Sequence, residues 1–506
     1  MEKNIENQNL SKIAVENSVY SFVSIFISKI GGLIFTIIIA RILLPELFGI
    51  YSLALSVITI VITFTDLGVG SASIMYVSDA LGKNSKGKAR TYFRYLLKIK
   101  FLLIIISILI VLAIAKYLSY NIFNKPLVFF PLVFACLYIL MESLRSYLAN
   151  LFTATKNLKP TPFLEVIYQV SKIFLSLFAV LLLSTQFKVA GVFVAFGLSG
   201  FLFLVASLII LIKRDKKLFF GKMEKIEKPR VWQYIKFMGL ASLSLVFFSS
   251  VDTLMLGAFV EASYLGYYRA ALSLILTIAS LLSISGILLP IFTQIHKDRL
   301  KRGFQKTFRY ILMFSIPIFF GLIFIAKDLI IAIYGTEYLA AITPLYVLSL
   351  LIVVVPLVSL YSTLFAAREN SRDLSGFIFI SLILNIILNY FLIKIFLRIS
   401  PEYAIIGSSL AVLISQCFLL ISLSIRAKIR FRISLKSSSF FKFLISSLGM
   451  SLFLMLFNYL LNLNLFLGIL EIILGGGIYF GILFLIKGIR GEDLKLIKNL
   501  RPKNPQ

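Results

Sequence analysis

Apolar runs long enough to cross a lipid bilayer recur along almost the entire chain of 506 residues. A membrane-spanning helix needs about 20 predominantly apolar residues. Apolar side chains make up 59% of the sequence and charged ones 14%, so a soluble protein of this composition would have too little polar surface to cover its core. The runs predict an all-α polytopic membrane protein with about fourteen transmembrane helices, at 18–40, 50–74, 101–118, 127–152, 162–184, 189–212, 237–258, 264–290, 308–326, 340–366, 375–396, 402–425, 439–461 and 464–486.

Basic residues indicate which side of the membrane each loop occupies. The chain has 51 Lys and Arg against 22 Asp and Glu, a net charge of +29. With the N-terminus inside, the inward segments hold 40 of these basic residues and the outward loops about 7. The charge therefore reflects topology and not a nucleic-acid partner. It predicts a multi-pass protein of the cell membrane with both termini in the cytoplasm.

Two halves of the chain are related in sequence. Residues 48–56 (FGIYSLALS) and 265–273 (LGYYRAALS) share five of nine residues at an offset of 217, each at the outer start of the second helix of a half. Parallel repeats of this kind are a transporter architecture, with substrate bound between the halves. The predicted domains are an N-terminal lobe with a basic linker (1–236), a C-terminal lobe (237–436), and helices 13 and 14 with a cytoplasmic tail (437–506).

Motifs for enzymatic chemistry are weak. The string 82–89 (GKNSKGKA) ends in Ala89 where a phosphate-binding loop needs Ser or Thr. The single histidine, His296, has no metal-ligand spacing around it, and Cys136 and Cys417 lie inside apolar runs. The sequence therefore predicts no enzyme, no cofactor and no metal site.

Ionisable residues inside the predicted helices are the candidates for function. Each is unfavourable by roughly 2.5–3.5 kcal/mol at the bilayer centre, so it is expected to face a protein interior or a water-filled cavity. The predicted substrate-binding residues are Lys29, Lys172, Arg269, Arg145, Glu142, Glu165, Asp66 and Asp252.

Several of these residues have a structural alternative. Glu142 and Arg145 lie three apart on one helix face and could neutralise each other. Asp66 precedes the sequence Leu-Gly-Val-Gly and could satisfy the backbone at a helix break. Asp252 and Arg269, near the outer surface, could extend to water. Lys29 and Lys172 lie near the middle of their helices, with Glu165 seven residues before Lys172, and a cavity role is favoured for both.

Two further patterns point to helix packing. Asn385 and Asn389 stand one turn apart on the eleventh predicted helix, where interhelical hydrogen bonding is favoured over binding of sugar hydroxyls. Gly477 and Gly481 form a GxxxG pair, which predicts a close helix contact.

Two stretches carry a resemblance to a known family. Residues 40–51 (ARILLPELFGIY) and 65–70 (TDLGVG) resemble the polysaccharide-export flippases, the translocases of O-antigen and lipid-linked oligosaccharides in the multidrug/oligosaccharidyl-lipid/polysaccharide exporter superfamily. Residues 265–270 (LGYYRA) are also similar to that family.

The resemblance implies two six-helix lobes around a central cavity and movement of a polyprenyl-(pyro)phosphate-linked glycan to the outer leaflet by alternating access. It also implies cationic residues of the first, second and eighth helices at the pyrophosphate; Lys29 and Arg269 lie in such helices, while the second helix has only Asp66. The expected partners are the lipid-linked glycan, membrane lipids and glycan-assembly enzymes, with a proton or sodium ion open as the coupling ion.

Two alternatives remain open. A drug or organic-cation antiporter of the same superfamily would use unpaired carboxylates, for which Asp66, Asp252 and Glu471 are candidates. A membrane glycan polymerase or glycosyltransferase is disfavoured by the short outer loops and the lack of an Asp-x-Asp pair.

Overall fold

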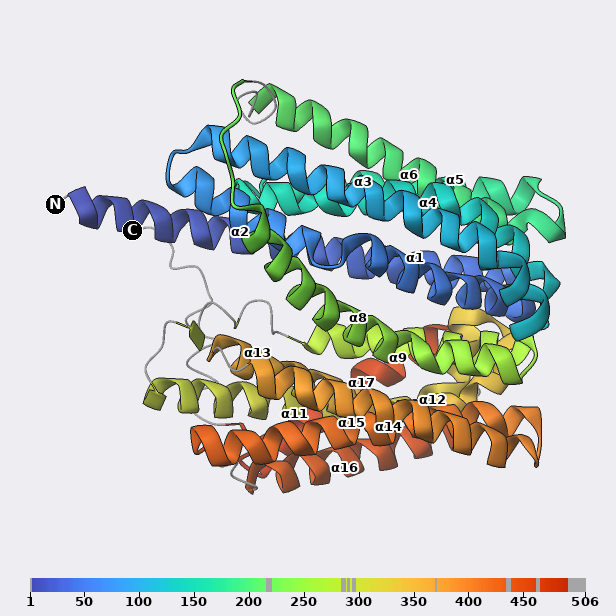
Figure 1. The fold of residues 1–506 in the computed structure, drawn as a ribbon. Helices are drawn as coiled ribbons and strands as arrows, with labels where there is room; N and C mark the ends of the chain where they lie inside the picture. Colours follow the sequence, from blue (N-terminus) through green and yellow to red (C-terminus); the bar gives the residue numbers. More distant parts are fainter. Residues whose placement is uncertain are drawn as a thin grey trace. The chain divides into compact units, whose positions relative to one another are not determined.

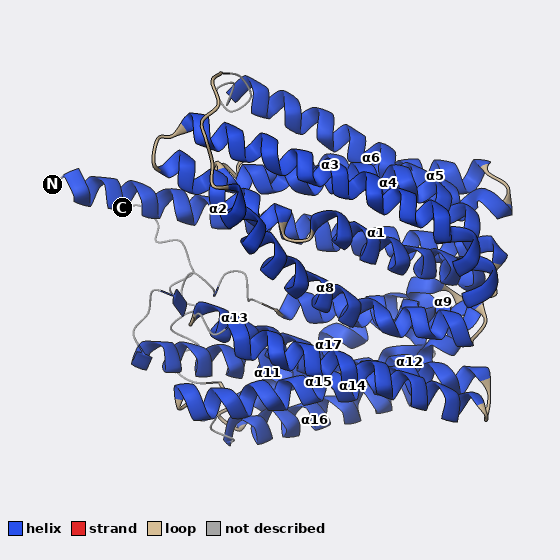
Figure 2. Ribbon diagram, in the orientation of Figure 1, coloured by secondary structure: helices blue, strands red, loops and turns tan. Residues whose placement is uncertain are grey.

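The computed structural model describes residues 2–214, 221–283, 288, 292–293, 297–368, 371–433, 438–460 and 465–489. Every regular element within these ranges is helical (Figure 1, Figure 2). This agrees with the all-α membrane protein predicted from the apolar runs.

The first part of the chain, residues 2–214, folds into six α-helices and two short helical turns. The elements are α1 (Glu2–Asp66), α2 (Val69–Gly82), α3 (Lys86–Tyr117), the π-helix η1 (Leu118–Ile122), the 3-10 helix η2 (Pro126–Val128), α4 (Phe129–Ala154), α5 (Thr161–Leu182) and α6 (Thr185–Arg214). The second part contains α8 (Lys228–Phe259), α9 (Ala262–Leu282), α11 (Lys297–Tyr334), η3 (Thr336–Ala341), α12 (Ile342–Leu348), α13 (Leu351–Ala367), α14 (Ser371–Leu397), α15 (Pro401–Phe431), α16 (Ser438–Leu460) and α17 (Leu465–Leu485).

Helix α1 is two helices joined at a sharp break. Leu44 has φ 60° and ψ 170°, outside the helical region, and Pro45 follows it. Proline has no N–H to continue the helical ladder, so the chain restarts there as a second helix. A second break follows α1, where Leu67 (φ 38°) and Gly68 (φ 86°) both take left-handed conformations. The Asp66 carboxylate accepts a hydrogen bond from the Gly70 N–H at 3.2 Å across this break, as predicted.

Ten of the described helices are long and apolar enough to span a membrane, or eleven if the bent pair 336–348 and 351–367 is one span. The difference from fourteen arises in three places. The continuous run Glu16–Gly82 contains two predicted spans, η3, α12 and α13 together cover one, and the apolar parts of α8 and α17 (Val246–Phe259 and Leu470–Leu485) are short.

The chain divides into two compact units. Unit 1 comprises 1–270 and 378–412, and unit 2 comprises 271–377 and 413–506. The core of unit 1 lies among α2 to α6 and the first turns of α8, with Tyr147, Phe152 and Phe93 among its largest buried side chains. In unit 2, α16 packs between α11 and α17. All eight predicted substrate-binding residues belong to unit 1.

The equivalent glycines of the two sequence repeats make a reciprocal contact in unit 1. A Cβ at Gly49 would collide with the carbonyl oxygen of Ala262 on α9, and a Cβ at Gly266 would collide with that of Pro45 on α1. The two helix backbones therefore touch, and only glycine fits at either position.

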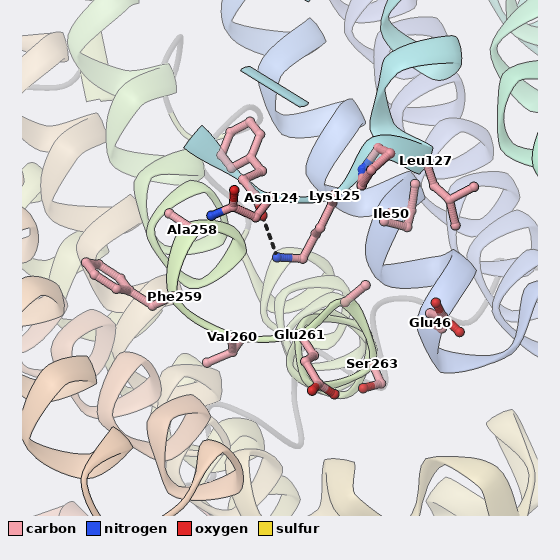
Figure 3. Close-up of a pocket in the computed structure, with 13 residues that line it drawn as sticks. Glu46, Ile50, Asn124, Lys125, Leu127, Ala258, Phe259, Val260, Glu261 and Ser263 are labelled. Atoms are coloured by element: carbon pink, nitrogen blue, oxygen red, sulfur yellow. Dashed lines mark hydrogen bonds between the residues drawn. The ribbon is translucent and has the colours of Figure 1, made fainter. Parts of the chain in front are cut away.

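A cavity of about 610 Å³ borders this contact. Lys125, between η1 and η2, lines it, and its Nζ donates to the Gly257 carbonyl oxygen on α8 at 2.6 Å. Figure 3 shows Lys125 reaching from its loop toward the turn between α8 and α9.

Candidate functional site

Helix α5 directs its polar face toward the protein interior. Glu165, Gln169, Lys172 and Ser176 recur on one face and are all at least nine-tenths buried. The opposite face carries exposed apolar side chains, Phe174, Phe178 and Leu181 among them. A helix with this pattern suits a lipid environment, because its apolar face meets hydrocarbon and its polar face meets other protein groups.

Arg145 on α4 is the centre of an ion-pair network. Its Nε donates to Glu142 Oε2 at 2.7 Å and its Nη2 to Glu142 Oε1 at 2.6 Å, a bidentate pair. Its Nη1 lies 3.6 Å from Glu165 Oε2 on α5. The structure therefore confirms the Glu142–Arg145 pair predicted from their spacing and adds Glu165 to it. Two carboxylates therefore share one guanidinium.

Aromatic rings hold the guanidinium in place. The Arg145 Cζ lies 4.4 Å from the ring centroid of Tyr168 and 5.3 Å from that of Phe203. The Tyr168 hydroxyl donates to Glu142 Oε2 at 3.4 Å. Stacking and bidentate bonding together fix the plane of the guanidinium, which a lysine could not reproduce.

The ammonium of Lys172, on the polar face of α5, is surrounded by aromatic rings. Its Nζ lies 4.8 Å from the centroid of Phe35, 5.6 Å from Tyr168 and 5.7 Å from Phe196. The side chain is 8% exposed, and within the described part of the chain the ammonium makes no hydrogen bond or ion pair. Cation–π contacts stabilise a desolvated ammonium only in part, so its three donors remain available to an anion.

Lys29 lies outside this cluster. The N-terminal segment of α1 runs along α5: the Ser24 and Thr161 hydroxyls are 2.9 Å apart, and a Cβ at Gly31 would lie 2.8 Å from Gln169 Cγ. Phe35 of α1 lies beside Lys172. Lys29 precedes Phe35 by six residues, which places it about 9 Å away from Phe35 along the helix axis. The Lys29 side chain is exposed, and within the described part of the chain no hydrogen bond or ion pair joins it to the cluster.

Asp66 has a partner that sequence reasoning missed. Lys100 on α3 donates to Asp66 Oδ1 at 2.7 Å, and its side chain is 1% exposed. The predicted span starts at 101, so the sequence places Lys100 in the segment before it. A signal was present, because Leu96, Lys100, Ile104 and Val111 fall on one buried face of α3.

Asp252 and Arg269 are positioned differently from each other. Asp252 is 3% exposed and accepts a hydrogen bond from the Tyr268 hydroxyl at 2.5 Å, so extension of its carboxylate to water is ruled out. Its Oδ1 has no hydrogen-bond partner among the described residues. Arg269 is half-buried and donates to Thr253 Oγ1 at 3.3 Å.

Asn389 on α14 makes an interhelical contact as predicted, whereas Asn385 bonds to Asn389 along the same helix. Asn389 Oδ1 accepts a hydrogen bond from Ser408 on α15 at 2.7 Å, and its Nδ2 lies 3.2 Å from Asn385 Oδ1. The GxxxG prediction is wrong for the described residues, because a Cβ at Gly477 or Gly481 would meet nothing within 4 Å.

The site therefore brings together Arg145, Glu142, Glu165 and Lys172, and leaves Lys29 and the Asp66–Lys100 pair outside the cluster. Among the described residues no three His, Cys, Asp or Glu side chains could hold a metal. His296 lies outside the described residues. Cys136 and Cys417 are half-buried free thiols.

A family model described as "Polysaccharide biosynthesis protein" matches residues 14–296, more than half of the chain. The chain belongs to this family. The match runs from residue 14 within α1 to beyond the end of α9, and it includes the whole cluster around Arg145 and Lys172. No curated protein sequence matches the chain.

Several solved structures have the same fold. The inward-closed lipid II flippase MurJ has a TM-score of 0.74 at 18% identity, covering 93% of this chain and 100% of that one. An inward-facing multidrug resistance MATE family transporter of the MOP superfamily has a TM-score of 0.64 at 14% identity, covering 82% and 99%. A MOP superfamily transporter from Pyrococcus furiosus, with a binding pocket of reverse polarity, has a TM-score of 0.58 at 14% identity, covering 84% and 97%.

These likenesses show the fold of the MOP superfamily, the multidrug/oligosaccharidyl-lipid/polysaccharide exporters named above. The fold is one that transporters adopt, in agreement with the prediction of a transporter and not an enzyme.

Proposed function

We propose that this member of the polysaccharide biosynthesis protein family is a flippase. It moves a polyprenyl-(pyro)phosphate-linked oligosaccharide from the inner to the outer leaflet, for synthesis of cell-surface polysaccharide or glycoprotein. The observation that carries the proposal is the buried Lys172 ammonium, which has aromatic neighbours but no anionic partner among the described residues. An anionic phosphate supplies that partner.

The architecture of the proposal follows the predicted topology. Fourteen spans form two six-helix lobes, 1–236 and 237–436, around a central cavity, with 437–506 appended and both termini in the cytoplasm. Transport proceeds by alternating access of the two lobes. The sugar crosses in the wet cavity while the isoprenoid tail stays in lipid.

The predicted site residues take different roles in binding. Lys172 gives charge-assisted hydrogen bonds to the phosphate, for which a compact ammonium is sufficient. Arg145 is held by Glu142 and Glu165 and sets the electrostatic environment of Lys172. Lys29 and Arg269 add positive charge along the path of the phosphate, from α1 and α9. Asp66 and Asp252 have protein partners and act on helix geometry more than on substrate.

A drug or organic-cation antiporter is the second candidate, and one observation favours it. A buried Asp252 oxygen has no hydrogen-bond partner within the described residues. Against it, the carboxylates of Glu142, Glu165 and Asp66 all face Arg145 or Lys100. A cationic drug would therefore have to compete with cations that are already in place.

Deletion of the gene in its native organism tests the proposal. We expect the lipid-linked glycan to accumulate in the inner leaflet and the wild-type gene to restore export. Sensitivity to organic cations with normal glycan export would establish the antiporter instead.

Variants of the two lysines then test the site. Lys172→Ala should abolish export with the protein still in the membrane, and Lys172→Arg should retain part of it. A packing role predicts instead that Lys172→Ala lowers the protein level and that Lys172→Met restores both level and export. Normal export by Lys29→Ala and Lys172→Ala together would overturn the site assignment.

A further inference from the structure

Residues 221–227, ahead of α8 in unit 1, cross the first turns of α3 and are fastened to them (Figure 1). Arg90 on α3 donates from Nη1 to the Lys222 carbonyl oxygen. The Glu224 N–H donates to Thr91 Oγ1 at 3.1 Å. We call residues 221–227 the linker strap. Its contacts with α3 hold the chain in a defined position where α8 begins.

The linker strap and its surroundings carry more positive than negative charge. The Glu224 carboxylate lies against Gly87 in the first turn of α3, where negative charge is favoured. The Glu227 carboxylate lies 4.0 Å from Arg230 Nη1. The exposed cations of the strap, of the start of α8 and of the adjoining part of α3 are Lys222, Lys225, Lys228, Arg230, Lys236, Lys86, Lys88 and Lys98. Two carboxylates neutralise only a small part of this charge.

Tyrosine rings fix the first turn of α8 beside the strap. The Tyr76 ring on α2 stacks on Tyr92 of α3, with 5.2 Å between their centroids, and the Tyr76 hydroxyl donates to the Arg230 carbonyl oxygen at 3.1 Å. The Lys228 Nζ lies 5.6 Å from the centroid of Tyr95. Lys228 is exposed and makes no ion pair within the described part of the chain, so its ammonium can bind an anion from outside the protein.

The first turns of α8 have one buried apolar face and one exposed basic face. Val231 and Ile235 are 0% and 3% exposed and belong to the core of unit 1. Lys228, Trp232 and Lys236 recur every four residues and therefore share another face, which we call the basic face. All three side chains are exposed, and Trp232 is the single tryptophan of the chain.

Two helices place this region at the depth of the lipid headgroups on the predicted cytoplasmic side. Trp232 precedes the predicted span 237–258 by five residues, or about 7.5 Å along α8. Tyr95 precedes the predicted span 101–118 by six residues, or about 9 Å along α3. The headgroup region is roughly 5–8 Å thick on each side of the hydrocarbon, so both rings lie within it or at its outer edge.

We propose that the basic face of α8 binds an anionic phospholipid of the cytoplasmic leaflet. Lys236 at the hydrocarbon boundary and Lys228 on the water side extend toward one headgroup phosphate, and the Trp232 indole lies between them beside the upper part of the acyl chains. The cations of the linker strap add attraction for anionic lipid over neutral lipid. The proposal requires a membrane-spanning protein with this linker in the cytoplasm, and it does not depend on glycan export.

An exposed indole favours a lipid over a soluble phosphate compound as the ligand. Tryptophan is enriched at the membrane interface because its ring is apolar and its N–H is polar. A phosphate compound in solution would be bound by the lysines alone and would gain nothing from Trp232.

The fluorescence of Trp232 tests the site directly, because the chain has no other tryptophan. The full-length protein is reconstituted in vesicles of phosphatidylcholine and phosphatidylglycerol. Each lipid in turn carries bromine atoms near the top of its acyl chains, where bromine quenches a neighbouring indole. Both leaflets have the same composition, so the orientation of the protein does not affect the result.

We expect brominated phosphatidylglycerol to quench Trp232 roughly tenfold more effectively than brominated phosphatidylcholine at the same mole fraction. Equal quenching by the two lipids would overturn the proposed preference. No quenching by either lipid would show that Trp232 lies away from the acyl chains, and this would overturn the site itself.

Two pairs of variants separate a site from a diffuse surface charge. Lys228→Gln with Lys236→Gln should abolish the preference for phosphatidylglycerol. Lys156→Gln with Lys159→Gln is the matched control, because it removes two exposed cations from the turn between α4 and α5 on the same predicted side. The control should keep the preference. Equal loss in both pairs, or no loss in the first pair, would overturn the proposal.

A soluble competitor distinguishes the lipid from a free phosphate compound. Glycerol 3-phosphate in large excess should leave the quenching by brominated phosphatidylglycerol unchanged. Relief of the quenching would assign the basic face to a soluble phosphate compound and overturn the lipid site.

Discussion

The Lys100 ammonium lies 2.7 Å from the Asp66 carboxylate, although the two residues are 34 positions apart. Lys100 is 1% exposed and Asp66 is 30% exposed, so the pair closes the end of α1 against α3 at the edge of the core. Lys100→Met would leave Asp66 without a cation, and we expect a loss of about 3 kcal/mol in the free energy of unfolding. Thermal unfolding of the purified protein measures this.

The double variant Asp66→Asn with Lys100→Met is the control for that prediction. It removes both charges, so it should recover most of the lost stability. Equal destabilisation by the single and the double variant would mean that Lys100 acts through packing alone.

Arg145→Lys should lower the free energy of unfolding, although lysine keeps the positive charge. Lysine cannot make the bidentate contact with Glu142 or stack on Tyr168, so two or three charge-assisted contacts are lost. We expect a destabilisation of about 2 kcal/mol and reduced export. Arg230→Lys is the matched control, because Arg230 is exposed and its Glu227 contact is 4.0 Å long. Equal unfolding temperatures for the two variants would contradict a fixed guanidinium.

Lys125 should make the free energy of unfolding depend on pH in the alkaline range. Burial lowers the pKa of Lys125, and the nearby Glu261 carboxylate opposes that shift in part. Between the lowered pKa and the ordinary value of about 10.4, the unfolded chain binds more protons than the folded one. The folded state therefore gains stability from this residue as pH rises through that window.

Lys125→Met removes the titrating group, so the wild-type protein should gain stability relative to it as pH rises. Urea or thermal unfolding at several pH values measures the difference. A difference that is flat or falls with pH would contradict burial of the ammonium.

Single cysteines test the predicted topology. Lys225→Cys and Lys327→Cys each place a thiol at an exposed position of the protein without native thiols. The basic linker is predicted in the cytoplasm and Lys327 outside, so an impermeant maleimide should label only Lys327→Cys in intact cells. Labelling of Lys225→Cys from outside would overturn the fourteen-helix topology.

Hydropathy alone was sufficient to locate the helices, since each predicted span overlaps a helix of the structure. Local spacing was sufficient for Glu142 and Arg145, which are neighbours on one helix. It could not place Glu165 against Arg145, because that contact depends on how α4 and α5 pack. It also missed Lys100, since a charge beside an apolar run resembles a loop residue until its helix face is known.

The contact of Gly49 with Gly266 is made by main-chain atoms, and this has a consequence for how the protein can vary. Neither residue has a side chain to lose, so every substitution adds volume where a single methyl group would already collide. The side chains of α4 and α5 around Lys172 can be exchanged without altering that contact. The polar cluster on α4 and α5 can therefore vary in its side chains while the main-chain contact between α1 and α9 stays the same.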